Sequence, residues 1–473
     1  MPSRRSLALA MSLAIGSMLL PVMSAAAAES LTTIPDSAIK VAESLRDGAL
    51  KDDTGYRIVE SLTTEVGPRM AGGPNDLRAV AWAEAKFKAL GFDKVYKEPV
   101  TFPKWERRSE SARVLGAYSQ PLEITALGGS VGGDVRGDIV RFDSVQALQD
   151  APESAVRGKI VFLDVSMEPY RDGRDYGKGS RARGAGPGLA ATKGALGYVM
   201  RSAGTDSHRF PHTGITRYPE GVKPIPAAAL STVDAEQLTR LLKRGPQQLH
   251  LQLDCGWNGT FTSYNVIGEI TGSSKPDEVV VIGGHLDSWD LGTGAIDDGA
   301  GIAITMGAGA LIGKLPEAPA RTVRVIAFAN EEQGLHGGKA YAQAHAADIT
   351  RHQIAAESDF GAGRIYAFVT SAPDYAKDAE RRIAAVLKPL GIANKVGEGG
   401  PGPDISPFAE KGLAWASLSQ DGTDYFDLHH TADDTLDKID PSALAQNVAA
   451  YAAFAYLAAE AEGDFGSAAT TTP

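Results

Sequence analysis

Residues 278–330 read EVVVIGGHLDSWDLGTGAIDDGAGIAITMGAGALIGKLPEAPARTVRVIAFAN, and this stretch decides the fold class. It holds two apolar runs of strand length, 278–287 and 321–330, separated by a helical pattern at 301–315. A strand, a helix and a second strand in succession place the two strands parallel in one sheet. Strand and helix patterns keep alternating up to residue 462. We therefore predict an α/β domain with a mixed, largely parallel sheet flanked by helices on both faces.

The chain before this stretch predicts an earlier part of the same domain, followed by an insert. Three helical patterns and one strand pattern come first: 36–48, 56–66, 77–91 and 94–102. Short β-like runs and many glycines then replace that texture and indicate a β-rich insert at 116–255. The domain itself is predicted to be discontinuous, at 36–115 and 256–463. Inside the insert, the segment 171–188, rich in Gly, Arg and Asp, is predicted to be a loop.

The first 28 residues have the layout of a secretory signal peptide. Two arginines precede an apolar run from residue 7 to residue 23, and an alanine-rich stretch follows. Gly16 and Pro21 interrupt the run, which favours a cleaved signal over a retained membrane anchor. We expect an exported protein, periplasmic or secreted, without a stable membrane anchor. After residue 28 no segment is expected to span a bilayer.

Composition excludes several classes of site and partner. Cys255 is the single cysteine, so an internal disulfide and a thiolate metal cluster are ruled out. We expect Cys255 to be a small buried apolar residue. The net charge of −11 argues against nucleic-acid binding, because no basic stripe would neutralise phosphates. The final residues, 464–473, have the composition of a disordered tail.

Five polar segments follow strands or lie in loops of the α/β region: GGHLDSWD (283–290), GAIDDGAG (294–301), ANEEQG (329–334), ESDFG (357–361) and LHHTADDT (428–435). Functional groups gather at the carboxyl ends of strands in such sheets, so we expect these segments on one rim. Imidazole and carboxylate groups suit zinc, and two neighbouring divalent ions need a bridging anion. We predict a two-metal site with these ligands: His285, Asp297, Glu332, Asp359 and His430.

Residue spacing assigns roles within this set. Asp297 is the better bridging ligand, whereas capping the next helix is a sufficient role for Asp298. Asp287 lies two residues after His285 and is predicted to orient its imidazole. Adjacent residues that leave a strand point in opposite directions. We therefore assign Glu332 as a ligand and the residue before it, Glu331, as the general base that faces the attacking water.

The last segment and the substrate contacts leave choices open. His429 and His430 are adjacent, so only one is expected to point at the site, and His430 is chosen. No substrate-binding residue is predicted. Arg181, Arg183 and Asp404 would suit the recognition of substrate termini, and equally a solvated loop.

These motifs resemble the M28 family of co-catalytic zinc peptidases, whose ligand motifs occur here in order. Three further strings resemble one of its subfamilies: VGPRMAG (66–72), FPKWERRSESA (102–112) and PGPDISP (401–407). The resemblance implies that His285, Asp297 and Asp359 hold one zinc, that Asp297, Glu332 and His430 hold the other, and that Glu331 is the base. It further implies a cis Asp297–Asp298 bond, a protease-associated domain in the insert, a homodimer, and dipeptide substrates with free ends.

Three alternatives remain open. An aminopeptidase acting on longer peptides would have the same fold and ligands. A glutaminyl cyclase shares the fold but uses one zinc, and the complete ligand set and the large insert argue against it. A catalytically inactive, receptor-like binding protein would have the same domains without metal ligands, whereas this chain keeps all five.

Overall fold

The computed structural model describes residues 31–395, 397 and 399–467. The predicted signal peptide, residues 1–28, lies outside these residues, as does most of the predicted tail. The first tail residues are packed: Phe465 is fully buried, and the Ser467 hydroxyl donates to the Gln353 carbonyl at 2.9 Å. The chain is therefore anchored to the core up to Ser467.

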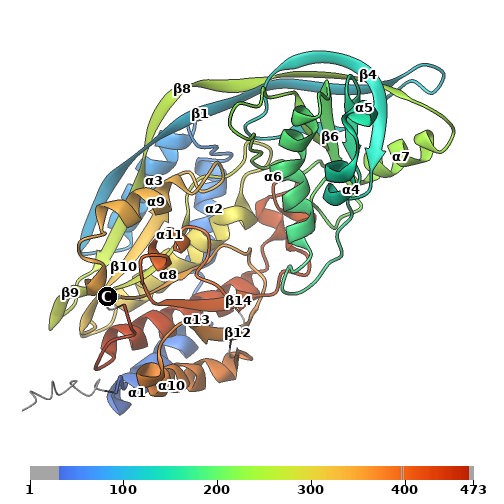
Figure 1. Cartoon of the computed structure of the whole chain (residues 1–473). Coiled ribbons are helices and arrows are strands. Elements are labelled where there is room, and N and C mark those ends of the chain that lie inside the picture. Colours follow the sequence, from blue (N-terminus) through green and yellow to red (C-terminus); the bar gives the residue numbers. More distant parts are fainter. Residues whose placement is uncertain (1–30, 396, 398, 468–473) are drawn as a thin grey trace, which may run out of the picture. The chain divides into compact units, whose positions relative to one another are not determined.

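One 14-stranded sheet runs through the protein (Figure 1). Its first half contains these strands in spatial order: β13 (Ala393–Asn394), β12 (Ile365–Thr370), β14 (Trp415–Gln420), β11 (His352–Glu357), β9 (Lys275–His285), β10 (Arg321–Phe328) and β8 (Gln248–Ile270). Strands β14, β11, β9 and β10 are parallel, while β12 and β8 run antiparallel to their neighbours β14 and β10. The prediction of a mixed, largely parallel sheet is confirmed.

The second half of the sheet belongs to the insert. Strand β8 and its antiparallel partner β1 (Lys94–Leu115) extend from the first half into it (Figure 1). There β8 pairs with the first of four parallel strands: β4 (Gly133–Phe142), β5 (Ile160–Leu163), β6 (Gly197–Arg201) and β7 (Ala227–Leu230). Two short strands lie at the edges: β3 (Ile124–Ala126), which pairs with β7, and β2 (Gln120–Leu122), which pairs with β1. The predicted boundary at 255/256 therefore falls inside a continuous strand.

Helices α4 (Val145–Asp150), α5 (Glu153–Val156), α6 (Tyr176–Thr192) and α7 (Thr232–Leu242) accompany the insert strands. Helix α6 shows that the loop predicted at 171–188 is wrong from Tyr176 onward, whereas 171–175 lie outside any helix. Its glycines allow close packing: a Cβ on Gly186 would lie 2.1 Å from the Tyr198 hydroxyl, and one on Gly179 would lie 2.5 Å from Met167 Sδ. Contact with the sheet thus stabilises a helix whose glycine content disfavours it.

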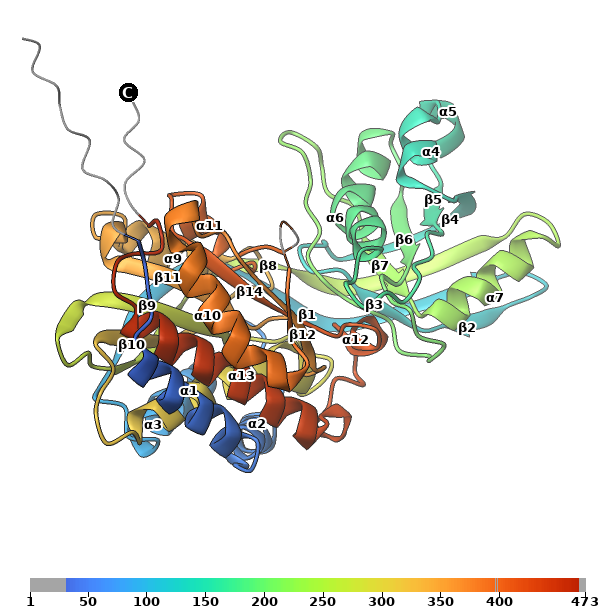
Figure 2. The same ribbon diagram turned by 90° about the horizontal axis from the view of Figure 1, so that it is seen from below.

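Helices cover both faces of the first half of the sheet. Val280 and Ile282 of β9 pack into the same core as helices α1 (Asp36–Ala49), α2 (Thr54–Glu65), α3 (Asp76–Ala89), α8 (Ala300–Gly313), α10 (Lys377–Leu387) and α13 (Pro441–Glu460). Val279 and Val281 face α9 (His336–Ala344) and α11 (Ser406–Ala409) on the other side. Figure 2 shows α1, α2 and α13 gathered on the first face. Burial on both faces explains why β9 is a continuous apolar run.

Two buried features bear on the sequence expectations. Ala295–Gly313 is long and apolar enough to cross a membrane by length and composition alone, contrary to expectation, but 94% of its most apolar part is buried inside the protein. It is a core helix. Cys255 is buried as expected, and burial raises the pKa of its thiol to about 11.

Candidate metal centre

The polar segments meet at the carboxyl ends of the parallel strands, as predicted. His285 is the last residue of β9, Asp359 comes two residues after β11, and Glu332 follows β10. Asp297 lies in the turn Ala295–Gly299 that leads into α8. His430 follows the short helix α12 (Tyr425–Leu428). The sheet topology therefore brings all five predicted ligands to one rim.

Asp297 lies at the middle of the cluster. Its Oδ1 is 3.0 Å from His285 Nε2, and its Oδ2 is 3.2 Å from His430 Nε2. Asp359 Oδ1 lies 3.5 Å from His285 Nε2, and Glu332 Oε2 lies 2.9 Å from His430 Nε2. Two groups of three ligand atoms share Asp297, and within each group the atoms lie within 4.8 Å of one another. One group is His285, Asp297 and Asp359, and the other is Asp297, His429 and His430. Asp297 therefore belongs to both groups.

His429 corrects the expectation that only one of the adjacent histidines faces the site. The two imidazole rings stack with their centroids 3.5 Å apart, and His429 Nε2 lies 3.6 Å from Asp297 Oδ2. His430 has a φ of 63°, in the left-handed region, so the backbone does not alternate here as it would in an extended chain. Proximity therefore makes His429 a further candidate ligand on the side of Asp297 where His430 and Glu332 lie.

The donor atoms fit a divalent cation such as zinc. The cluster supplies imidazole nitrogens and carboxylate oxygens, the ligands that zinc takes in hydrolases that have no thiolate ligand. Glu332 Oε1 is buried and has no hydrogen-bond partner, while its Oε2 accepts from the Trp289 indole N–H at 2.6 Å. A buried carboxylate oxygen without a donor is costly, and a bound cation would satisfy it.

Electrostatics in the cluster depend on burial and on the two histidines. Burial opposes the charge of Asp297, but hydrogen bonds from His285 and His430 hold the pKa of its carboxyl well below the usual value. Burial likewise opposes the charge of His285, yet the carboxylates around it raise the pKa of its imidazole well above the ordinary range. Burial raises the pKa of Glu331 well above its usual value, and the charges of Asp359 and Glu332 add to that effect.

Asp287 lies between His285 and Glu331. His285 Nδ1 donates to the backbone carbonyl of Asp287 at 3.0 Å and lies 3.6 Å from its carboxylate. That carboxylate accepts the backbone N–H of Glu331 at 3.0 Å. Asp287 therefore contacts the imidazole as predicted, but its carbonyl makes the closer contact and its carboxylate holds the loop of the predicted base.

Several residues that support the site were missed as functional residues. The fully buried Arg69 donates to the carbonyls of Leu286, Thr293 and Gly294 at 2.5, 2.7 and 2.8 Å. Asp434 accepts the backbone N–H groups of two residues, Ile296 and Asp297, at 2.6 and 3.2 Å. Both residues lie in motifs that stood out in the sequence, VGPRMAG and LHHTADDT, but only the structure shows which loops they hold.

Asp298 has the capping role expected for it and a second one. Its Oδ1 accepts the backbone N–H of Gly301 at 3.0 Å near the start of α8, and its Oδ2 accepts the backbone N–H of His285 at 3.0 Å. The Asp297–Asp298 peptide bond is cis, as the family resemblance implied.

The three open candidates for binding substrate termini separate in the structure. Arg181 is exposed, whereas Arg183 and Asp404 are buried. Asp404 accepts the Gly338 backbone N–H at 3.1 Å, and burial raises the pKa of its carboxyl to about 8. Arg183 lies beside His430, with Nη1 3.4 Å from Nδ1. Neither buried residue is a solvated loop residue.

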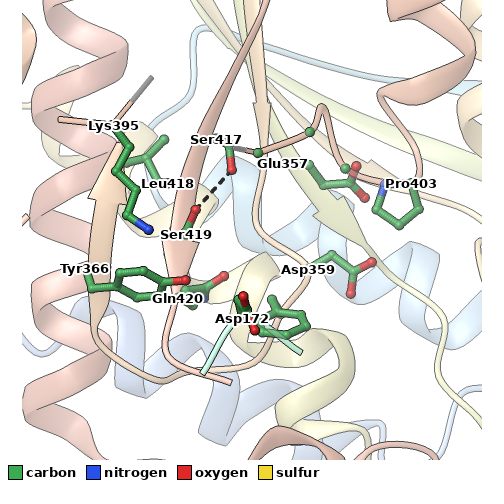
Figure 3. A pocket seen from close by; sticks show the side chains of 14 residues that line it. Asp172, Glu357, Asp359, Tyr366, Lys395, Pro403, Ser417, Leu418, Ser419 and Gln420 are labelled. Atoms are coloured by element: carbon green, nitrogen blue, oxygen red, sulfur yellow. Dashed lines mark hydrogen bonds between the residues drawn. The ribbon is translucent and has the colours of Figure 1, made fainter. Parts of the chain in front are cut away.

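A cavity of about 350 Å³ adjoins the cluster at Asp359 (Figure 3). Glu357 and Asp359 line one side of it, and Tyr366, Lys395 and Gln420 line the other (Figure 3). The glycines of the loop 399–402 form part of its wall. The cavity therefore offers a polar space next to the candidate metal ligands.

Comparison with known proteins identifies the family of the chain. Residues 265–455 match the model of peptidase family M28. Over 412 residues the chain is 35% identical to carboxypeptidase Q from Bos taurus, covering 86% of this chain and 85% of that protein. The chain belongs to peptidase family M28. This M28 protein is thus a metallopeptidase similar to carboxypeptidase Q, and its family implies zinc at the two buried His/Asp groups.

Solved structures agree with the M28 assignment. A peptidase M28 precursor from Shewanella amazonensis is 51% identical, with a TM-score of 0.88, over 90% of this chain and 97% of that one. A zinc aminopeptidase from Bacillus subtilis is 20% identical, with a TM-score of 0.60, over 85% of this chain and 94% of that one. The second likeness shows the fold alone.

Proposed function

We propose that this M28 metallopeptidase holds two zinc ions and hydrolyses short peptides, in particular dipeptides with free termini. One ion would be held by His285, Asp297 and Asp359, and the other by Asp297, Glu332 and His430. The position of Asp297 carries the proposal, because its two oxygens face the two histidines at 3.0 and 3.2 Å. When bound, two such ions polarise the scissile carbonyl and lower the pKa of the attacking water.

The residues of the chain supply the proton transfers and the positioning. Glu331 takes the proton of the attacking water and later delivers it to the leaving amine. Burial raises the pKa of its carboxyl above the usual value, which makes it a stronger base. Asp287 holds the backbone of Glu331 by the 3.0 Å hydrogen bond, and Trp289 holds one oxygen of Glu332. These contacts fix the backbone of Glu331 and the carboxylate of Glu332 before substrate arrives.

The size of the cavity supports a short substrate. Its volume of about 350 Å³ lies near the lower end of the range for ligand pockets, about 300–1,000 Å³. The relative named carboxypeptidase Q supports cleavage at a free carboxyl end. Together they favour dipeptides over long peptides, for which the cavity next to Asp359 would take one residue of the substrate.

Three expectations from the sequence remain part of the proposal. The insert at 116–255 corresponds to a protease-associated domain, the protein acts as a homodimer, and it is exported to the periplasm or the medium. Support for them comes from the resemblance to the family and from the signal-like sequence of the first 28 residues.

The test is hydrolysis of a matched peptide panel by the zinc-loaded enzyme. We expect cleavage of dipeptides with two free ends, and a large loss of kcat/KM when the carboxyl end is amidated or the amino end is acetylated. Equal cleavage of amidated dipeptides and longer peptides would instead identify an aminopeptidase. No cleavage together with no bound zinc would identify a receptor-like binding protein.

A further inference from the structure

We propose that the insert segment 204–214, called the strap here, is a positioning element for His430. The proposal rests on the proposed function, in which His430 is a zinc ligand. The strap belongs to the insert, whereas His430 belongs to the α/β domain, and the two are more than 200 residues apart in sequence. Their contacts nevertheless involve both the imidazole and the backbone of the ligand segment.

The carbonyl of Thr213 selects the tautomer of His430. The imidazole Nδ1 lies 3.1 Å from this carbonyl oxygen, which can only accept, so Nδ1 carries the proton. Arg183 Nη1 donates to the same carbonyl at 3.3 Å, and this second donor fixes the oxygen in place. Nε2 then faces Asp297 and Glu332 at 3.2 and 2.9 Å, and with a metal bound it would offer its lone pair to the ion.

The strap also holds the backbone on both sides of the ligand. The Thr213 N–H donates to the His430 carbonyl at 3.0 Å, and His212 Nδ1 donates to the His429 carbonyl at 2.7 Å. On its other side His212 donates from Nε2 to Asp206 at 2.6 Å, and it is 1% exposed. Because both ring nitrogens have partners, the His212 ring cannot turn without losing a bond.

One more pair of contacts extends this attachment to helix α12. The Thr205 N–H donates to the Phe426 carbonyl at 3.2 Å, and the Thr205 hydroxyl donates to the Asp427 carboxylate at 2.7 Å. The strap therefore fixes residues 426–430 at several points, through backbone and side chains of the insert. Zinc at His430 and docking of the strap must then stabilise each other, since coupling between two equilibria is reciprocal.

The first experiment measures zinc retention in the full-length holoenzyme. His212→Ala removes both hydrogen bonds, and His212→Asn keeps a donor near the place of Nδ1. We expect His212→Ala to release one of its two zinc ions at about 10–100-fold lower chelator concentration than wild type, the range for outer-shell partners. His212→Asn should recover part of the loss. Zinc per chain is measured by mass spectrometry after dialysis against graded chelator.

A matched control is a second insert histidine that pairs with an aspartate. His250 Nε2 lies 2.7 Å from Asp134 on strands β8 and β4, and His250→Ala should keep zinc as wild type does. Wild-type zinc retention in His212→Ala would overturn the proposal. Equal zinc loss in His250→Ala would also overturn it, because the effect would then be general damage to the insert.

A second measurement needs no variant. Hydrogen exchange of the wild-type amides at 204–214 should accelerate on removal of zinc, whereas strand β6 of the insert should not change. Unchanged exchange in the strap would overturn the proposal. The proposed function fails separately: His430→Ala that still holds two zinc ions would show that His430 is no ligand. Loss of one zinc in His430→Ala, with none lost in His212→Ala, would reject the strap alone.

Discussion

Two buried polar clusters lie in the first half of the sheet, and they differ in how well their atoms are paired. In the candidate metal centre, Asp287 Oδ2, Glu332 Oε1 and His429 Nδ1 are buried without hydrogen-bond partners. Beneath α9, a second cluster joins Tyr96, Glu269, Arg324, Tyr341 and His352. Within the described part of the chain, no buried side-chain atom of these five residues lacks a partner.

The difference separates a functional cluster from a structural one. Arg324 forms an ion pair with Glu269 at 2.7 Å, and the Tyr341 hydroxyl connects Arg324 to His352 with hydrogen bonds of 2.7 and 2.9 Å. Charges and donors balance there without any ligand. The metal centre instead gathers carboxylates that only a cation would satisfy. Unpaired buried atoms gather at the candidate metal centre, although single ones also occur elsewhere, at Glu98, Gln353 and Asn447.

The first prediction compares the substitution of one carboxylate in each cluster, Glu331 in the metal centre and Glu269 in the paired cluster. Glu331→Gln should lower kcat by about 10²–10⁴-fold and leave zinc content unchanged, because general-base catalysis contributes that much. Glu269→Gln should leave kcat unchanged but reduce the free energy of unfolding by about 1–3 kcal/mol, because it removes the charge that pairs with Arg324 and keeps only a neutral acceptor. Steady-state kinetics, metal analysis and denaturant unfolding measure the four outcomes. Full activity in Glu331→Gln would reject its role as base.

The second prediction concerns the pH dependence of the paired cluster. Burial, and then the charge of Arg324, lower the pKa of His352 to about 4 from 6.5. The unfolded state thus binds more protons between pH 4 and pH 6.5. Stability from this group is complete above pH 6.5 and lost as the pH falls toward 4, by about 3 kcal/mol. Denaturant unfolding of the zinc-free proteins should show this loss in wild type and not in His352→Gln. The same loss of stability with falling pH in both proteins would contradict the prediction.

The third prediction concerns the hydrogen bond between Trp289 and Glu332 in the metal centre. Trp289→Phe keeps the ring but removes the N–H that holds Glu332 Oε2 at 2.6 Å. We expect zinc affinity to fall by about 10–100-fold with little change in the stability of the zinc-free protein. Trp257→Phe is the matched control, because Trp257 is 49% exposed. Equal zinc affinity in the two variants would show that Trp289 only packs against its neighbours.

Helix α6 and the histidine pair show where prediction from sequence stops. The glycines and Pro187 within 171–188 disfavour a helix locally, and only the sheet behind α6 supplies the packing that decides otherwise. His429 was set aside because adjacent side chains normally alternate. The φ of 63° at His430 removes that alternation, and the His430 carbonyl accepts a hydrogen bond from the strap, a contact that no local pattern contains.

Other missed residues have the same cause. Arg69 and Trp289 lie in motifs that stood out in the sequence, yet their partners are 217 and 43 residues away along the chain. A motif indicates that a residue matters, whereas a hydrogen bond to a distant carbonyl or carboxylate depends on how the whole chain packs. Asp287 is an intermediate case: it contacts His285, but its carbonyl rather than its carboxylate makes the closer contact.

The sequence by itself determined the α/β class, the order of strands and helices after residue 264, and the segments that meet at the rim. These follow from local periodicity and from the rule that parallel strands bring their carboxyl ends together. Tertiary structure alone decided that Asp297 faces both histidines, that Arg69 and Trp289 hold the surrounding loops, and that the insert contacts His430. Such contacts join residues far apart along the chain, so their geometry depends on how the whole chain packs.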